Sequence, residues 1–439
     1  MGKSARVLTL AEAAACVRPD DTLGVPLGPG QPGAFLHALG ARDDWRALTV
    51  FSALLLDAYP LFTRPGVRLL SGFYGPVERA LAAAGHDVCF VAADFRRFAS
   101  FARALSPRVM TTLAAPPSAD GWLSLSLHAG ATVDELHRCG RDPERLLVVE
   151  VNPALPRTLG LLPAHRHALH LSEIDVIVES DRPLPALPEA VPSAVEIRIA
   201  EHARRFISDG CTLQTGIGGV PSQIARLLAD GPGGDYGVHS EMFTDGLMAL
   251  HRAGKVTNRK GLFDGFSVAT FAFGSHALNE WLDGNEAVRF LPVDLVNDPS
   301  RIARNRRMVS INGALSIDLL GQVIADRIGD RQHSGIGGHE DFVAGAALSD
   351  GGRSLVCLPS TARTAAGRIS RIVNAFPAGA CVTTPRHQID VVVTEYGAAE
   401  LAGLTCQERA EALAAIAHPA MRDALHAGKH ELPVLPAES

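Results

Sequence analysis

Short β-rich runs alternate with helical patterns along the whole chain of 439 residues, and this alternation constrains the fold most strongly. The clearest strand candidates are residues 146–151, 174–178, 353–358 and 390–394. Helical periodicity lies between them, for example at residues 201–208 and 221–228. Parallel strands need a crossover connection, usually a helix, so this alternation is typical of α/β units around parallel sheets. The sequence therefore predicts an α/β fold with open, mainly parallel sheets.

A proline-rich segment at residues 180–193 divides the chain in two. It carries proline at positions 183, 185, 188 and 192, a density that suits an extended connection and breaks helices. The chain is also too long for one ordinary core. We therefore predict an N-terminal α/β domain of residues 1–185 and a C-terminal α/β domain of residues 186–439.

The two halves share one pattern. Residues 11–39 align without a gap on residues 200–228, and seven of these 29 positions are identical. Both copies have the order helix, acidic turn, strand, glycine loop and helix, which strengthens a weak count of identities. The two domains are therefore predicted to be related in topology.

Composition excludes several classes of protein. Apolar residues make up 47% of the chain and charged residues 20%, and the net charge of -6 offers no basic field for nucleic acid. No run reaches the 18 or so apolar residues of a membrane span, and the N-terminus lacks a signal-type apolar core. The seven cysteines contain no CxxC pair. We expect a cytoplasmic protein with reduced thiols and no membrane or nucleic-acid partner.

A metal site is not indicated. His165, His167 and His170 cluster in sequence, but no cysteine or carboxylate joins them at ligand spacing, so a surface cluster is the better interpretation. No Gly-x-Ser-x-Gly motif is present.

The first glycine loop, GPGQPG at residues 28–33, satisfies the letter of the dinucleotide fingerprint. Its prolines would distort the tight turn, and Asp57 is an uncertain ribose ligand. A nicotinamide site and a plain strand-to-helix turn both remain open for this loop.

Two further glycine loops lie in the second half, at residues 215–222 and 334–339. Glycines let the backbone approach a ligand, and free N–H groups at a helix start attract phosphate or developing negative charge. Two such loops in one half suggest a large phosphorylated ligand. The candidate contact residues are Gly216, Ile217, Gly218, Gly219, Val220, Gly335, Gly337 and Gly338.

Glu241 ends a strand-like run, residues 236–240, which follows the helix that begins near residue 221. A right-handed crossover would make this strand parallel to residues 211–215 and bring Glu241 to the same sheet edge as the second glycine loop. Two alternatives stay open from the residues alone. Glu241 could cap a following helix at residues 242–253, and Glu395 occupies a similar position at the end of another strand.

These segments together resemble the acetyl-CoA hydrolase/transferase branch of the family I coenzyme A transferases, especially members similar to 4-hydroxybutyrate CoA-transferase. The resemblance covers nearly the whole chain. The segments that carry it are Val151-Asn152-Pro153, Pro156-Arg157-Thr158, residues 213–221, 237–246, 256–260, 296–299, 310–312, 318–322, 334–338, Asp341-Phe342 and 394–397.

The resemblance implies that Glu241 forms a covalent glutamyl-CoA thioester, that the loop of residues 216–220 binds CoA, and that Gly338 contacts CoA. It also implies a homodimer or homotetramer that holds no permanent cofactor and uses coenzyme A, acyl-CoA and small carboxylic acids as substrates. We expect a ping-pong CoA transfer, with backbone N–H groups of the glycine loops as oxyanion donors and Gly30 and Gln31 as further candidates.

Several points stay open at this level. Relatives often carry Gln and Arg where this chain has His339 and Ala344, which leaves the acceptor open among acetate, butyrate, 4-hydroxybutyrate and dicarboxylates such as succinate or itaconate. Acyl-CoA hydrolysis and non-catalytic CoA binding are the alternative functions.

Overall fold

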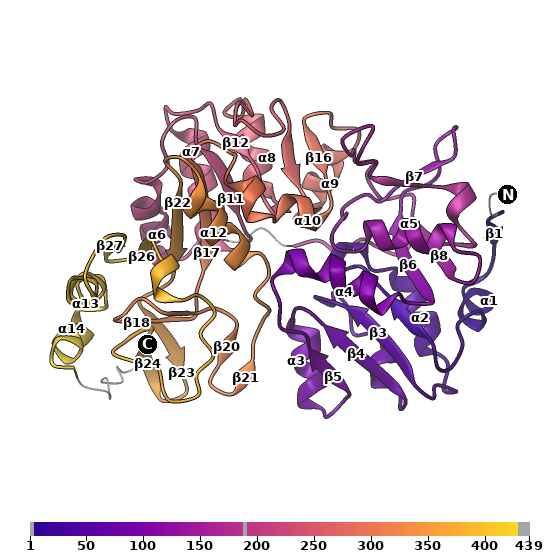
Figure 1. Cartoon of the computed structure of the whole chain (residues 1–439), viewed down its shortest axis with the longest axis horizontal. Helices are drawn as coiled ribbons and strands as arrows, with labels where there is room; N and C mark the ends of the chain where they lie inside the picture. The colour runs from indigo at the N-terminus through magenta and orange to yellow at the C-terminus, as the bar shows by residue number, and fades with distance from the viewer. Residues whose placement is uncertain (1–3, 188–190, 429–439) are drawn as a thin grey trace.

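The computed structural model describes residues 4–187 and 191–428. Two open sheets lie side by side along the long axis of the molecule, and each is built from one half of the sequence (Figure 1). The N-terminal sheet has eight strands, all paired in parallel. Their order is β1 (Arg6–Val7), β10 (Val176–Glu179), β8 (Leu146–Val151), β6 (Val109–Ala114), β2 (Thr22–Gly24), β3 (Leu48–Ser52), β4 (Val67–Ser71) and β5 (Val88–Phe90).

The C-terminal sheet has six strands, and only its last pair is antiparallel. Their order is β12 (Gly237–Val238), β11 (Thr212–Thr215), β17 (Met308–Gly313), β22 (Arg353–Cys357), β26 (Val391–Thr394) and β27 (Gly397–Glu400). The predicted α/β fold with two mainly parallel sheets is thus confirmed.

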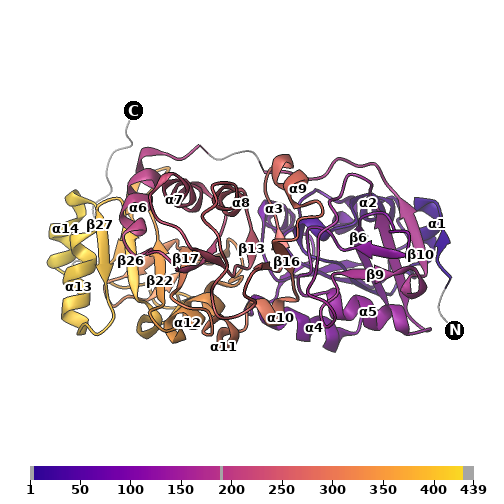
Figure 2. The same cartoon turned by 90° about the horizontal axis from the view of Figure 1, so that it is seen from above.

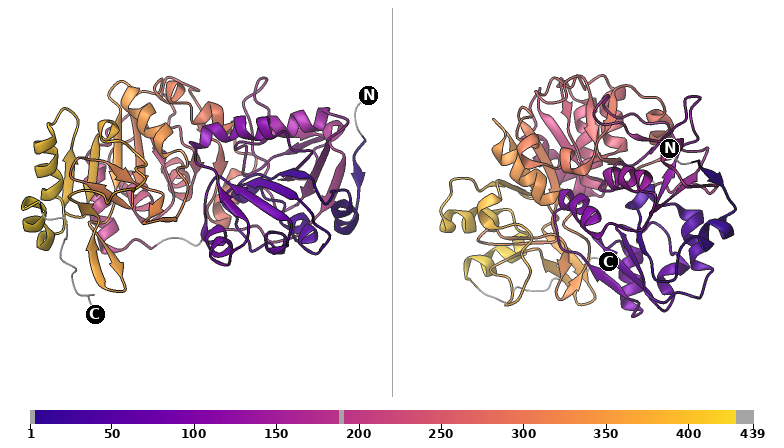
Figure 3. Two further views of the ribbon diagram at one scale, coloured as in Figure 1. Left: turned by 60° about the horizontal axis from the view of Figure 1, so that its bottom comes forward. Right: turned by 45° about the vertical axis from the view of Figure 1, so that its right-hand side comes forward.

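Helices cover both faces of each sheet, as Figures 2 and 3 show. On the C-terminal sheet, α6 (Ala194–Arg204), α7 (Gly219–Asp230) and α8 (Asp245–Arg252) lie on one face, opposite α11 (Pro299–Ile302) and α12 (His339–Leu348). In the N-terminal half, α5 (Val133–Arg141) packs on β6 and β8. Because both faces are covered, central strands such as β6 are buried at every residue.

The predicted strands agree with the structure to within two residues, and residues 146–151 form β8 with the expected bounds. The helices differ more. The helix predicted at residues 201–208 is α6, which already begins at Ala194 because Ser193 and Glu196 form a capping box there. The helix predicted from residue 242 begins at Asp245, since Met242–Phe243 forms the short strand β13.

Both halves follow the repeated element order. In the first, α1 (Leu10–Ala15) leads to β2, a short 3-10 turn at Gly28–Gly30 and α2 (Gly33–Gly40). In the second, α6 leads to β11, the second glycine loop and α7. The described part of the proline-rich segment forms neither helix nor strand, and its residues 188–190 lie outside the described ranges. The domain boundary at residues 185 and 186 stays a prediction.

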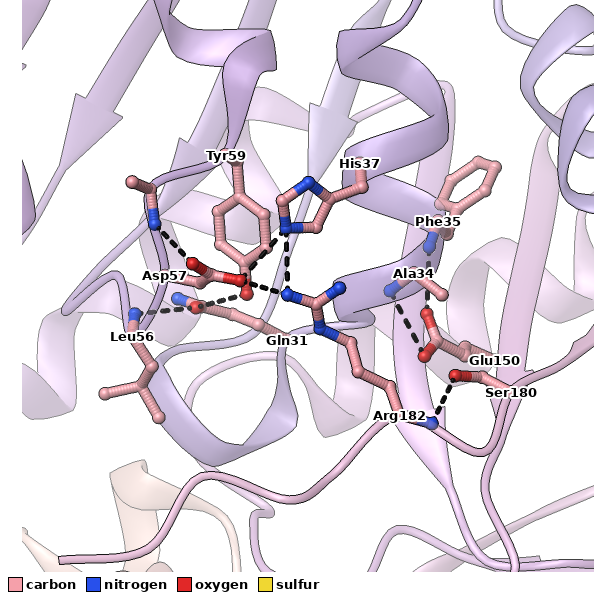
Figure 4. Close-up of polar contacts among 11 residues, drawn as sticks. Gln31, Ala34, Phe35, His37, Leu56, Asp57, Tyr59, Glu150, Ser180 and Arg182 are labelled. Atoms are coloured by element: carbon pink, nitrogen blue, oxygen red, sulfur yellow. Dashed lines mark hydrogen bonds and ion pairs between the residues drawn. The ribbon is translucent and has the colours of Figure 1, made fainter.

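A buried carboxylate fixes α2 to the N-terminal sheet. Glu150, on β8 and 1% exposed, accepts hydrogen bonds from the backbone N–H groups of Ala34 (3.3 Å) and Phe35 (3.0 Å) in the first turn of that helix (Figure 4). These are N–H groups that a helix cannot satisfy itself. The same view shows Arg182, from the segment after β10, donating to Asp57, which also contacts His37 at 2.9 Å.

Within residues 4–187 and 191–428, the helices are all too short or too polar to cross a lipid bilayer.

Replacing the Glu150 carboxylate tests its contribution to the fold. Glu150→Gln puts an amide against two buried N–H groups and leaves at most one acceptor for them, so we expect a loss of about 1–3 kcal/mol in the free energy of unfolding. Urea unfolding followed by circular dichroism measures it. Glu179→Gln, on the exposed end of the neighbouring strand β10, is the matched control. Equal stability of the two variants would contradict this account.

Candidate active site

A cavity of about 310 Å³ lies where the two halves of the chain meet. Its walls come from segments that follow the carboxyl ends of strands in both sheets. Leu27, Leu54 and Phe73 follow β2, β3 and β4, while Gly216 follows β11 and Gly313 ends β17. Ligands of open α/β sheets bind at this edge. The cavity is therefore a candidate binding site shared by both sheets.

Glu241 lies in the wall of this cavity, between the short strands β12 and β13. Strand β12 is parallel to β11, as the crossover argument predicts. The Glu241 carbonyl accepts hydrogen bonds from the N–H groups of Thr270 (2.9 Å) and Phe271 (3.3 Å). The helix-capping alternative is wrong, because α8 starts at Asp245 with Thr244 as its N-cap residue.

The Glu241 carboxylate is half-buried and held by one side chain. Asn297, directly after α10 (Val293–Val296), donates its Nδ2–H to Glu241 Oε2 at 2.6 Å. Burial raises the pKa of Glu241 to about 7, and the Asn297 hydrogen bond opposes this rise. Near neutral pH the carboxyl is thus poised between its protonated and ionised forms.

Gly338 leaves the space that this carboxylate fills. A Cβ atom at Gly338 would lie 2.1 Å from Glu241 Oε2 and 2.5 Å from Asn297 Nδ2, distances that no side chain can have. The third glycine loop is fixed in turn against the N-terminal half, since Gly337 accepts a hydrogen bond from the N–H of Phe95 at 2.9 Å.

A second carboxyl, Asp341, joins this network from the first turn of α12. Asn297 Nδ2 lies 3.3 Å from its Oδ2, and Arg96 of the N-terminal half donates to its Oδ1 at 2.6 Å. Burial raises the pKa of Asp341, while the Arg96 guanidinium opposes the rise. The ion pair between Arg96 and Asp341 therefore connects the two halves of the chain directly beside Glu241.

The structure brings the second and third glycine loops to one cavity. Gly216 and Ile217 of the second loop line it, and so do Gly335, Gly337 and Gly338 of the third loop. Gly218, at φ +113°, forms the N-cap of α7, and Gly219 and Val220 open that helix without lining the cavity. In the part of the chain that the structure describes, the N–H groups of residues 216–220 have no acceptor. They remain available to an anionic ligand.

Gly30 and Gln31 do not line this cavity. The Gly30 N–H donates to Leu27 and that of Gln31 to Gly28, within the 3-10 turn. The Gln31 side chain instead supports the cavity wall, because its Nε2 donates to the carbonyls of Ala53 (3.1 Å) and Leu54 (3.2 Å). Its Oε1 accepts a hydrogen bond from the N–H of Leu56 at 3.1 Å (Figure 4). The N–H groups of these two residues are therefore already bonded and lie outside the cavity, so they do not fit the role of oxyanion donors.

The other candidates lie elsewhere or in other roles. Glu395 is buried outside the cavity, where Ser360 donates its N–H and its hydroxyl to the carboxylate at 2.8 and 2.6 Å. Asp57, the possible ribose ligand, is bonded to His37 and Arg182. Of the two departures from the family pattern, His339 lines the cavity and Ala344 does not.

Sequence reasoning gave no role to Asn297, Asp341 or Arg96. The first two lie in segments that carried the family resemblance, so that pattern could have drawn attention to them. Arg96 stood in no motif, and only the packing of the two halves places it beside Asp341.

Comparison with known proteins gives the family. The model of the acetyl-CoA hydrolase/transferase C-terminal domain matches residues 274–428. The chain is 36% identical to a succinyl-CoA:cyclohexane-1-carboxylate CoA transferase of Geobacter metallireducens, over 96% of this chain and 94% of the relative. It is 44% identical to a 4-hydroxybutyrate coenzyme A transferase of Clostridium kluyveri over 64% of each chain. The crystal structure of RipA from Yersinia pestis superposes with a TM-score of 0.88, at 33% identity over 96% of both chains.

The chain is thus similar in sequence to CoA transferases and in fold to RipA. The chain belongs to the acetyl-CoA hydrolase/transferase family.

A methyl group at Gly338 tests the geometry around Glu241. Gly338→Ala would displace the carboxylate and its Asn297 partner, and we expect acyl-CoA turnover to fall about 100-fold, the usual effect of a misplacement near 1 Å. Steady-state kinetics with acetyl-CoA measures it. Gly313→Ala adds a methyl group to the same cavity where nothing lies within 4 Å, and it should stay close to wild type. Equal effects of the two variants would sink this interpretation.

Proposed function

We propose that this protein transfers CoA between an acyl-CoA and a small carboxylic acid, with Glu241 as the covalent nucleophile. The observation that carries the proposal is the position of the Glu241 carboxylate, in a cavity that the second and third glycine loops line. Relatives across almost the whole chain bear the names of CoA transferases, which supports the reaction class.

The reaction would proceed by exchange of acyl groups on Glu241. The ionised carboxylate attacks the thioester carbonyl, which forms an acyl-glutamyl anhydride and releases CoA thiolate. The thiolate then attacks the glutamyl carbonyl, which releases the first carboxylic acid and leaves a glutamyl-CoA thioester. A second carboxylate reverses these steps and leaves as its acyl-CoA, so the enzyme returns to its initial state.

The surroundings of Glu241 suit this role. A carboxylate with a raised pKa is a stronger nucleophile than one in water. Among residues 4–187 and 191–428, Asn297 alone donates a side-chain hydrogen bond to this carboxylate and so stabilises its charge. The unpaired N–H groups of residues 216–220 would hold phosphate groups of CoA. N–H groups of Gly337 and Gly338 are candidates to stabilise the oxyanions near Glu241.

Oligomeric state and location remain predictions: a homodimer or homotetramer in the cytoplasm. Acyl-CoA hydrolysis differs from the proposed reaction only in that water takes the place of the second carboxylate. A rate of acyl-CoA loss that is independent of added carboxylic acids would assign hydrolysis.

Covalent trapping tests the nucleophile. After mixing with acetyl-CoA and borohydride, mass spectrometry should find a reduced residue or a CoA adduct on the peptide that contains Glu241. Glu241→Gln should abolish both adduct and transfer while the protein stays folded. Glu395→Gln is the matched control and should retain labelling at Glu241. A label on Glu395 with Glu241 unmodified would refute the assignment.

The pH dependence of turnover tests the protonation state. Because the nucleophile must be ionised and the pKa of Glu241 is raised to about 7, kcat/KM for acyl-CoA should be constant above this value. Below it, kcat/KM should fall about tenfold per pH unit as the carboxyl is protonated. Initial rates between pH 5 and 9 measure the profile. A rate that stays constant down to pH 5 would be inconsistent with this role.

A further inference from the structure

We propose that the cavity selects acids whose chain is uncharged beyond the reacting carboxyl group, and that it discriminates against dicarboxylic acids. This inference rests on the proposed CoA transfer, since it concerns the acid that exchanges at Glu241. Of the acceptor acids that the sequence left open, it favours the monocarboxylic acids over dicarboxylic acids such as succinate.

The side of the cavity formed by the N-terminal half is apolar and largely aromatic. Its side chains Leu27, Leu54, Phe95 and Phe98 belong to one hydrophobic cluster that extends from the cavity wall into the protein. Met242 and Phe271 of the C-terminal half line the cavity as members of the same cluster. Phe95 packs edge to face on Phe271, with ring centroids 6.3 Å apart. Such a wall stabilises methylene groups and aliphatic rings by removing their surface from water.

No described residue that lines the cavity is a lysine or an arginine. Among the described residues that line it, Glu241 and His339 are the ionisable ones. His339 is buried, with no hydrogen-bond partner for its Nε2 among the described residues, and burial lowers its pKa to about 4. The imidazole is therefore neutral at the pH where Glu241 is ionised, and it supplies no countercharge.

The arginine beside Asp341, Arg96, is already paired with two carboxyl groups. Arg96 is bonded to Asp94 at 2.9 Å and to Asp341 at 2.6 Å, and it does not line the cavity. The positive charge of Arg96 is thus already paired with carboxyl groups, and the ionised Glu241 has the same sign as a second carboxylate. A distal carboxylate would thus lose its hydration without gaining a cation, the arrangement in which a buried charge is most costly.

The backbone at Leu54, in this wall, has an unusual conformation. Leu54 has a φ of +49°, a left-handed conformation that a leucine rarely adopts. Gln31 holds its carbonyl, and its own N–H donates to Phe73 at 3.0 Å. Strained residues that their surroundings hold in place are concentrated at functional sites. Here the strain fixes an apolar side chain in the wall of the cavity.

The size of the cavity agrees with this substrate class. About 310 Å³ lies at the lower end of the range for ligand pockets and exceeds what an acetyl group needs. The cavity therefore has room for an acid with several carbon atoms or a small ring, and its uncharged lining, not its size, is what disfavours a second carboxylate.

Matched pairs of acids test the inference. With acetyl-CoA as donor at pH 8, CoA transfer to butyrate is compared with transfer to succinate, and transfer to pentanoate with transfer to glutarate. Each pair has equal chain length and differs only in the distal carboxylate. We expect kcat/KM to be at least about 100-fold higher for the monocarboxylate, as for an unpaired buried charge. A preference below about tenfold, or one for the dicarboxylate, would overturn the inference.

Measuring the adduct on Glu241 as well distinguishes a failure of the selectivity from a failure of the proposed function. If the adduct on Glu241 forms from acetyl-CoA but succinate serves as well as butyrate, only the selectivity is wrong. If no adduct forms and no acid accepts CoA, the proposed function fails and this inference fails with it.

A variant of the wall supplies the converse test. Leu54→Lys introduces a cation at the half-buried position Leu54 and should raise the ratio of succinate to butyrate turnover at least tenfold. Leu54→Met, of similar size and without charge, should retain the wild-type ratio. An unchanged ratio in folded Leu54→Lys would show that this wall does not contact the acyl chain.

Discussion

The burial of one carboxylate between two halves of the chain governs the rest of this structure. Glu241 lies in a largely apolar cavity, with Asn297 as its side-chain hydrogen-bond donor and Gly338 leaving room for its oxygens. An ionised carboxyl in such a place loses hydration and gains little in return, so its pKa rises. The neighbouring backbone is held in place by side-chain hydrogen bonds. The Ser240 hydroxyl, for example, lies within hydrogen-bond distance of the carbonyls of Thr215 (3.1 Å) and Met242 (2.8 Å).

Contacts between the two halves complete the site. The third glycine loop belongs to the C-terminal half, yet it is bonded to Phe95, and Arg96 forms an ion pair with Asp341. These contacts place the apolar wall of the N-terminal half opposite the glycine loops of the C-terminal half. The C-terminal half supplies the carboxylate and the unpaired N–H groups of the second glycine loop, and the N-terminal half supplies an apolar surface opposite them. Neither half contains the whole cavity.

Local patterns predicted the strands well because each strand is a short apolar run bounded by polar or turn residues, as residues 146–151 are. Helix ends were harder to predict. The capping box at Ser193 lies inside the proline-rich segment, and tertiary pairing with β15 (Phe271–Ala272) makes Met242–Phe243 a strand instead of the first helical turn. Gln31 shows the same limit within the site. Gln31 lies within the first glycine loop and was a candidate oxyanion donor. Its side chain is instead bonded to the backbone of Ala53, Leu54 and Leu56, in the connection after β3.

The sequence alone determined the α/β class, the repeated unit, the two glycine loops of the second half and the nomination of Glu241 at a strand end. These depend on local periodicity and on the crossover rule, which act over a few tens of residues. Only the tertiary structure decided that Asn297 bonds Glu241, that Arg96 reaches Asp341, and that the wall opposite the carboxylate is apolar and without a cation. The two side-chain contacts join residues 56 and 245 positions apart. Such separations leave no periodic signal in the chain, because the packing of the two halves sets the contacts.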